Sequence, residues 1–493
     1  MSHTFFARRG IPLVLHLNGP LDVPALLRAC DAVADRHPVL GPVRVDRVES
    51  CPERYAGVAE EEVARPFDLE HGPLARFTLV TLGRDRNRLI FAAHGRVFDA
   101  CSKDVLIRDL ADAYFSRAAL PAPAVPYGEH HRPPTGTGEG GGDGTGDGGA
   151  RAFWRERGNA VPGLVLPGLR ATFHGFGPGG FVETVLAGAE FEAFATAATT
   201  LGATRFELLV AVVGVLLRGY GSTGSPLALA LGTRTDLTRD HIGSFVAEVP
   251  FAACPGSDET FPVYLRTVRT ELRELYRYRH VPPETTGRPV VLGYRRRAAV
   301  PYFPGVRAGV EWTVFNGAAR GVLHLEAVDG DGSLTLGLRF SPLAIGHDDV
   351  VLVAGHLRTL LRAIAAEPRA KVADLFARVP NFPYEEPPVS ELFSPAPAQI
   401  PDPGQGPEHL EWTDQEGQVI AQVREIWQEV LRVDDIKPDE DLYDLGGHSL
   451  TITQIIARAR RRLGVEVSLD VFFDNPTIAG MAEEVTRLRG EHT

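Results

Sequence analysis

The sequence is poor in cysteine, the residue that forms disulfide frameworks and thiolate metal sites. Only four of its 493 residues are cysteines, at positions 30, 51, 101 and 254, and no two of them have metal-ligand or CxxC spacing. We therefore expect reduced thiols. Lysine is nearly absent, since only three of the 51 basic residues are lysines. Acidic residues outnumber basic ones, and the formal net charge is −12. This balance argues against nucleic acid as a partner.

Long hydrophobic runs are also missing. The longest strongly apolar run, Leu208 to Leu217, has ten residues and is too short to span a bilayer. The first ten residues contain no apolar stretch of the kind that a secretory signal needs. We therefore expect no membrane association and place the protein in the cytoplasm.

Composition divides the chain into regions. A chain of 493 residues is too long to fold around a single hydrophobic core, so two or three domains are expected. Residues 121–149 are so rich in glycine that a flexible surface loop is expected, and residues 379–410 are a proline-rich, semi-stiff linker. Residues 411–493 hold 17 acidic and 9 basic residues, so this short segment carries −8 of the net charge.

One serine of the acidic segment stands where a helix is predicted to start. Apolar residues recur at helical spacing from position 450 to position 463, so the serine falls in the first turn. Unpaired N–H groups at that end favour a phosphodiester on the hydroxyl, although a serine that merely caps the helix is an alternative. The motif consists of Asp444, Leu445, Gly446, Gly447, His448, Ser449 and Leu450.

Residues 412–490 resemble a peptidyl carrier protein of nonribosomal peptide synthetases. The resemblance is carried by the run from Asp444 to Leu450 and by the later run from Val471 to Ala482 (VFFDNPTIAGMA). It implies a small all-α four-helix bundle over residues 411–493. It also implies a covalent 4′-phosphopantetheine arm on Ser449, which holds an aminoacyl or peptidyl thioester and is attached by a phosphopantetheinyl transferase from coenzyme A. The other six residues of the motif are implied to form the attachment site.

Residues 11–375 resemble the condensation domain of the same synthetases. The segments that carry the resemblance are Leu17–Asp22, Arg36–Leu40, Pro66–Leu74 and His241–Val246, in the order of the family. The implied fold is α/β (α+β), with two lobes that are each like chloramphenicol acetyltransferase and a tunnel between them. We expect a condensation-like domain over 1–378, with an N-lobe at about 11–160 and a C-lobe at about 161–378. The opening motif of the family has no counterpart here.

The active-site motif of that family, HHxxxDG, is altered in this chain. Four residues separate His94 from Asp99, whereas three separate the second histidine of the motif from its aspartate. His94 therefore matches the first histidine, and Gly95 stands where the family has the histidine assigned to catalysis. Ala100 replaces the glycine. The resemblance implies that Asp99 pairs with Arg234 to hold the shape of the site.

The lost imidazole matters because a positioned base contributes about 10²–10⁴-fold, or roughly 3–5 kcal/mol, to such a reaction. Gly95 has no titratable atom, and Arg96 cannot act as a base. Ala247 also replaces an asparagine of the family. Three interpretations of the large domain stay open: a non-catalytic docking or recruiting platform, amide formation by an atypical mechanism, and another acyl transfer.

The expected partners follow from the two resemblances. This chain shows no adenylation or thioesterase domain, so an adenylation enzyme would load the carrier in trans and another protein would release the product. A tailoring oxygenase or other synthetase modules would meet the large domain. A purely structural scaffold with an unmodified carrier is the remaining rival.

Overall fold

The chain folds into two compact units. The first comprises Met1–Ala197 with Phe206–Tyr384, and the second comprises Glu385–Thr493 with the short segment Ala198–Arg205. The computed structural model describes residues 10–116, 120, 121, 123, 147–157, 163–171, 176–223, 226–283, 288–379, 414–431, 436–438, 442, 449–465, 467 and 477–490.

The N-lobe of the first unit is built on a five-stranded sheet with helices on both faces. In β1, Leu13, Leu15 and Leu17 join the core under α2 and α4, while Val14 joins the smaller core under α3. This alternation explains why β1 is a nearly continuous apolar run. The sheet order is β10-β1-β4-β3-β2, with β1 Gly10–Asn18, β2 Val45–Glu49, β3 Ala75–Thr81, β4 Arg86–His94 and β10 Arg307–Glu311; the helices are α2 Val23–Arg36, α3 Pro52–Ala64 and α4 Ser102–Ser116.

The C-lobe is built on a six-stranded mixed sheet in the order β6-β13-β12-β9-β7-β8. Helix α10 packs on β6 and β13, and α8 is buried along nearly its whole length. The strands are β6 Gly180–Ala187, β7 Leu227–Gly232, β8 Val246–Pro250, β9 Val290–Arg296, β12 Leu323–Gly330 and β13 Ser333–Phe340; β5 Phe176–Pro178 pairs separately with β11 Ala318–Arg320. The helices are α6 Asp147–Glu156, α7 Ala189–Thr200, α8 Arg205–Gly219, α9 Phe261–Tyr278, α10 His347–Ala366 and α11 Val372–Phe376.

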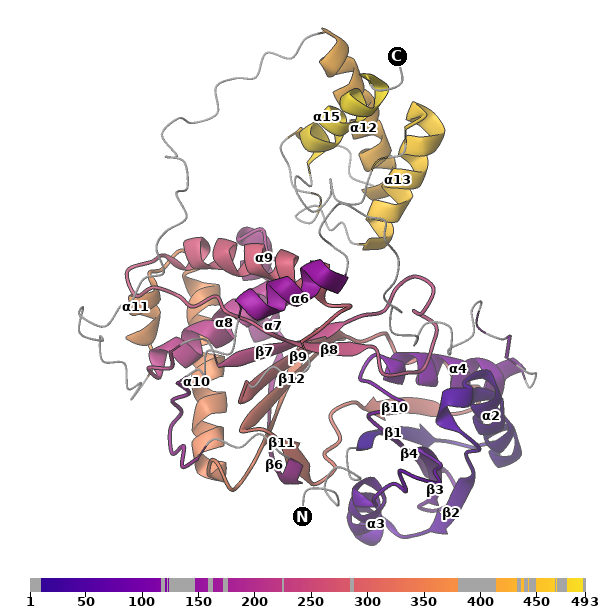
Figure 1. Ribbon diagram of the computed structural model, residues 1–493. Helices are drawn as coiled ribbons and strands as arrows, with labels where there is room; N and C mark the ends of the chain where they lie inside the picture. The colour runs from indigo at the N-terminus through magenta and orange to yellow at the C-terminus, as the bar shows by residue number, and fades with distance from the viewer. Residues whose placement is uncertain are drawn as a thin grey trace. The chain divides into compact units, whose positions relative to one another are not determined.

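One strand from late in the sequence crosses between the lobes. Figure 1 shows β10, coloured orange, beside the indigo strands of the N-lobe, and its register pairs Leu15 with Val310. The sequence predicts a strand over Val310–Phe315, within the range expected for the C-lobe; the observed strand begins earlier, at Arg307, ends at Glu311, and belongs to the N-lobe sheet. The crossing places the residues that follow β10 between the two sheets.

The second unit contains the carrier segment. Three helices, α12 Asp414–Leu431, α13 Ser449–Leu463 and α15 Ile478–Gly490, share one apolar core. Trp427 lies at its centre, and its indole N–H points at Met481 Sδ at 3.2 Å. The resemblance implies a four-helix bundle, and the short segment Ser468–Phe473, which falls between α13 and α15, lies outside the described residues.

The glycine-rich loop and the absence of membrane spans are two further predictions that can be compared with the structure. Gly148 and Gly149, assigned from sequence to the flexible loop, fall in the first turn of α6, while the rest of that loop lies mostly outside the described residues. Among the described residues no single helix is long and apolar enough to cross a membrane; only α7 and α8 together, across a bend of 98°, have that length and composition.

Candidate functional site

Helix α13 begins at Ser449. The first residues of a helix have backbone N–H groups without intrahelical partners, and this end carries about half a positive charge. A phosphodiester linkage on a residue at this position therefore fits the local electrostatics. Leu450 is the second residue of the helix; Asp444, Leu445, Gly446, Gly447 and His448 lie outside the described residues.

The helix is held by its buried face. Ile455 and Ala459 are fully buried at a spacing of four residues, and they pack with α12 and α15 in the carrier core. Arg458 and Arg462 lie at the edge of this buried face and pair with Glu429 of α12. These two arginines thus have partners within the carrier, and the core fixes the direction in which the helix start is presented.

In the first unit, His94 ends β4 and is completely buried. Its Nδ1 accepts a hydrogen bond from the backbone N–H of Arg96 at 3.2 Å, and its ring meets Phe67 edge-on at 5.9 Å between centroids. Its own backbone N–H donates to the Leu74 carbonyl at 2.7 Å. These contacts place His94 in the turn as a packed residue.

The two residues after His94 provide no proton acceptor. Gly95 is buried in the turn, and Arg96 is exposed. A guanidinium stays protonated at any physiological pH and therefore cannot remove a proton from an amine. The N-lobe side of the motif accordingly lacks a base at the position that the resemblance makes catalytic.

Both carboxylate oxygens of Asp99 are engaged. Oδ1 accepts hydrogen bonds from the backbone N–H and the hydroxyl of Ser102, at 2.7 and 2.9 Å. Oδ2 accepts from Arg234 Nη1 at 2.5 Å and from the backbone N–H of Phe245 at 2.9 Å. With four donors and 3% exposure, this carboxylate is committed to structure and is a poor candidate for a general base.

Arg234 completes a connection between the lobes. Its Nη2 donates to Ser102 Oγ at 2.8 Å and to the His241 carbonyl at 3.3 Å, and its guanidinium lies 4.7 Å from the Phe245 ring centroid. The structure thus brings Asp99 and Arg234 together, with Asp99 next to the start of α4 and Arg234 just after β7. Such a buried, hydrogen-bonded pair fixes how the lobes meet.

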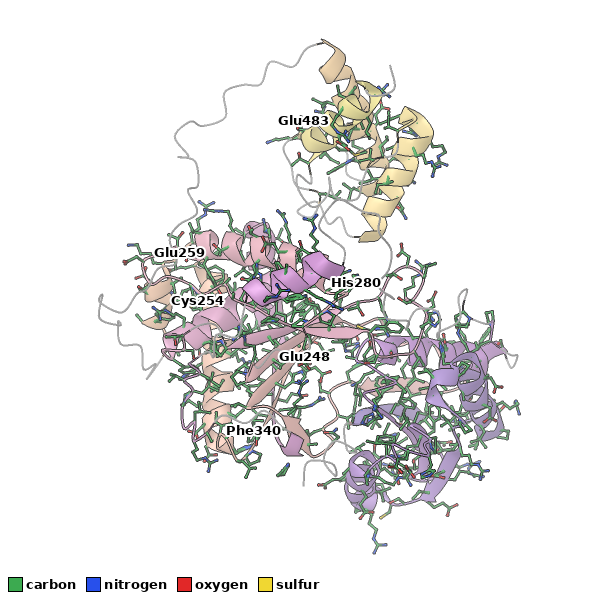
Figure 2. The ribbon with its side chains drawn as sticks, viewed as in Figure 1. Glu248, Cys254, Glu259, His280, Phe340 and Glu483 are labelled. Carbon is green, nitrogen blue, oxygen red and sulfur yellow. The ribbon has the colours of Figure 1, made fainter. Side chains whose placement is uncertain are left out.

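Sequence reasoning missed the charged residues on the opposing sheet. Arg295 of β9 donates to Asp104 of α4 at 2.8 Å, so its side of the sheet faces α4 of the N-lobe. Glu326 of β12 is on the same side of the sheet as Arg295, so alternate residues of β12 also face α4. Glu326 Oε2 lies 2.8 Å from Arg339 Nη2, and Glu248 of β8 lies along the same row of the sheet (Figure 2). The alternation of β12, in which His324 and Glu326 fall between the buried residues Leu323, Leu325 and Ala327, is the signal that could have identified this face.

Burial and neighbouring charges shift the pKa values on this face. Burial lowers the pKa of Lys103, which is fully buried and donates from Nζ to the Trp312 carbonyl at 2.6 Å, to about 7. Burial alone would raise the pKa of Glu326, but Arg339 and Lys103 outweigh it and lower that pKa to about 2. Burial, reinforced by Arg339, lowers the pKa of His324 to about 4. His324 is therefore neutral at pH 7.

The depressed pKa of Lys103 predicts a pH dependence. Above pH 7 the folded chain loses this proton while the unfolded chain keeps it up to about pH 10, so the free energy of unfolding rises with pH by up to about 1.4 kcal/mol per pH unit. We expect Lys103→Met to flatten this rise between about pH 7 and 8, below the usual titration of cysteine. Chemical denaturation of the first unit at several pH values measures the free energy of unfolding. An equal rise of this free energy with pH in the unaltered chain and in Lys103→Met would contradict the prediction.

Comparison with known proteins agrees with this geometry. Residues 45–285 match the family model of the condensation domain, and residues 421–485 match that of the phosphopantetheine attachment site. CymA of Salinispora arenicola, a probable nonribosomal peptide synthetase, is 31% identical over 302 residues, which are 56% of this chain and 4% of CymA. Surfactin synthase subunit 2 of Bacillus subtilis is 26% identical over 411 residues, 74% of this chain and 11% of that subunit. The chain thus spans a small part of these relatives.

Solved structures show the same fold for the large unit. The X-domain from teicoplanin biosynthesis superposes with a TM-score of 0.61 at 22% identity, over 76% of this chain and 95% of that one. The same domain in a complex with OxyB gives 0.60 at 23% identity, over 76% and 94%. The fold is therefore the two-lobed condensation fold, as the sequence predicted. The protein joins a condensation domain to a carrier domain of the nonribosomal peptide synthetase type, and such a carrier domain bears covalent 4′-phosphopantetheine.

Proposed function

We propose that this chain is a nonribosomal peptide synthetase component whose carrier domain holds an aminoacyl or peptidyl thioester on phosphopantetheine at Ser449. The observation that carries the proposal is the start of α13 at Ser449, within the segment that matches the attachment-site family. A phosphopantetheinyl transferase would attach the arm from coenzyme A in the cytoplasm, where both are available. The intact mass of the chain after this reaction tests the proposal, as argued in the Discussion.

We propose further that the condensation domain serves as a docking or recruiting platform for the loaded carrier. Gly95 offers no base, and Asp99 has both oxygens engaged. The hydrogen bonds around Asp99 and Arg234 nevertheless hold the two lobes together. A condensation domain that keeps its architecture but has no proton acceptor in the motif is suited to binding and positioning partners.

The proposed partners supply the missing steps. An adenylation enzyme in trans would load the carrier, and other synthetase modules would accept the product. The X-domain from teicoplanin biosynthesis, which is similar in fold to this condensation domain, is known in a complex with OxyB. By analogy we propose that the condensation domain recruits an enzyme, such as a tailoring oxygenase, that modifies the carried group.

Restoring the histidine alone is predicted not to create strong condensation. Gly95 is not the only departure from the family, because Ala247, 5% exposed in β8, also replaces a residue of the family pattern. We expect Gly95→His to give at most a few-fold more amide than Gly95→Ala, measured by mass spectrometry of loaded donor and acceptor carriers. A gain of about 10² or more would show that the single imidazole was all that was missing.

A second candidate function is amide formation with a displaced base. One observation favours it: His324 is a neutral imidazole on the sheet that faces α4. Its Nε2 lies over Gly293, where a Cβ would come within 3.8 Å of it. In that case turnover by the unaltered chain would be lost in His324→Gln and kept in Gly95→Ala.

A further inference from the structure

The start of α4 forms a joint between the two lobes of the first unit. Three backbone N–H groups of the C-lobe donate to side chains in or just before the first turn of this helix: Gly243 to Ser102 at 3.1 Å, Phe245 to Asp99 at 2.9 Å and Ala298 to Asp104 at 2.9 Å. We call these three donors the joint N–H groups. They keep their acceptors only while the lobes are in contact, so they report whether the joint is closed.

Lys103 lies within this joint, between Ser102 and Asp104. Its side chain is fully buried, and Nζ donates to the carbonyl of Trp312, in the segment that follows β10, at 2.6 Å. Among the residues that the structure describes, no carboxylate forms an ion pair with this ammonium group. A backbone carbonyl carries no net charge, so the partner of a protonated Lys103 does not neutralise it.

The charged groups that face this ammonium group are already paired with one another. Asp104 of α4 lies 2.8 Å from Arg295 of β9, and Glu326 of β12 lies 2.8 Å from Arg339 of β13. His324, the titratable neighbour of Glu326 on β12, is neutral at pH 7, because burial and Arg339 lower its pKa to about 4. Two cations thus balance two carboxylates, and the lysine proton adds a positive charge that these pairs do not balance.

We propose that Lys103 is a proton-controlled latch: loss of its proton favours the closed joint, and gain of the proton favours separation of the lobes. Separation lets water reach the ammonium group and removes the cost of burying it. Burial in the closed joint lowers the pKa of Lys103 to about 7, whereas a hydrated lysine has a pKa of about 10. Protons therefore bind preferentially to the open joint, and the equilibrium constant for opening falls by up to about tenfold per pH unit between about pH 7 and 10. Such control acts on the shape of the condensation domain, whatever the carrier holds.

Hydrogen exchange of the full-length chain, followed by mass spectrometry, tests the latch. We expect the protection factors of the joint N–H groups, corrected for the intrinsic effect of pH on exchange, to rise at least about tenfold between about pH 7 and 9. Lys103→Met, which has an uncharged side chain of similar length, should show constant protection over this range. Lys371→Met, at an exposed lysine of the same unit, is the matched control and should keep the rise. The thiol of Cys101 does not titrate in this range, because burial raises its pKa to about 11.

Three results would overturn the latch. The first is constant protection of the joint N–H groups in the unaltered chain, a comparison that needs no variant and holds even if Lys103→Met does not fold. The second is an equal rise in Lys103→Met. The third is protection of the joint N–H groups as strong as that of the buried N–H groups of α8, which would show that the joint opens only when the whole unit unfolds. None of these results depends on modification of Ser449, whose mass test stands or fails separately.

Discussion

Ser449→Ala is expected to abolish phosphopantetheinylation completely. Incubated with coenzyme A and a broad-specificity phosphopantetheinyl transferase, the unaltered chain should gain the mass of one 4′-phosphopantetheine group. The alanine variant should gain none, because it lacks the hydroxyl of the first residue of α13, which we propose as the attachment point. Intact-mass spectrometry measures both proteins directly.

A nearby hydroxyl provides the control for this experiment. Thr451, in the same helical turn, should be replaceable by alanine with the full mass gain retained. A gain that survives Ser449→Ala would place the arm elsewhere. No gain in the unaltered chain would favour the scaffold interpretation with an unmodified carrier.

Asp99→Ala is expected to destabilise the first unit severely, by about 3–5 kcal/mol, because it leaves the guanidinium of Arg234 without its buried partner. It also removes the acceptor for the N–H groups of Ser102 and Phe245. Chemical denaturation should show an earlier transition for the first unit, while the carrier transition should remain unchanged. The two units must be followed separately, because a two-unit chain does not unfold in one step.

An exposed pair at the same boundary between the lobes is the matched control. Arg108 of α4 lies 2.6 Å from Asp240, and both side chains are more than 40% exposed. We expect Asp240→Ala to cost less than about 1 kcal/mol, as is usual for solvated pairs. Equal effects at Asp99 and Asp240 would show that the buried pair has no special part in joining the lobes.

The sequence predicted local structure well wherever one helix or strand has its own start signal. Apolar spacing predicts a helix from about Val23 to Arg36, and α2 has those bounds, because Asp22 accepts a hydrogen bond from the Ala25 N–H at 3.0 Å and Pro24 favours the first turn. The sequence also predicts helices over Ser102–Phe115 and Phe261–Arg279, and α4 and α9 match these ranges to within one residue. Capping and periodicity are local, so they can be seen without the fold.

Long-range placement could not be predicted in this way. The alternation in β12 shows that His324 and Glu326 share a face, but it does not show that the face meets α4. The transfer of β10 to the N-lobe sheet likewise depends on an edge that β1 leaves open, some 290 residues earlier in the chain. The contact of Lys103 with the Trp312 carbonyl follows from that transfer, so no motif predicted it.

The most direct test of the account is the peptide-bond-forming capacity of the unaltered chain. The chain is converted to its holo form, loaded on Ser449 with an amino acid, and mixed with a donor carrier that bears a second aminoacyl group. The account predicts no amide above the level seen with the isolated donor and a free aminoacyl thioester. Amide that forms on most of the loaded chains and disappears in His324→Gln would contradict it. That result would show that the condensation domain catalyses amide formation with a base outside its altered motif.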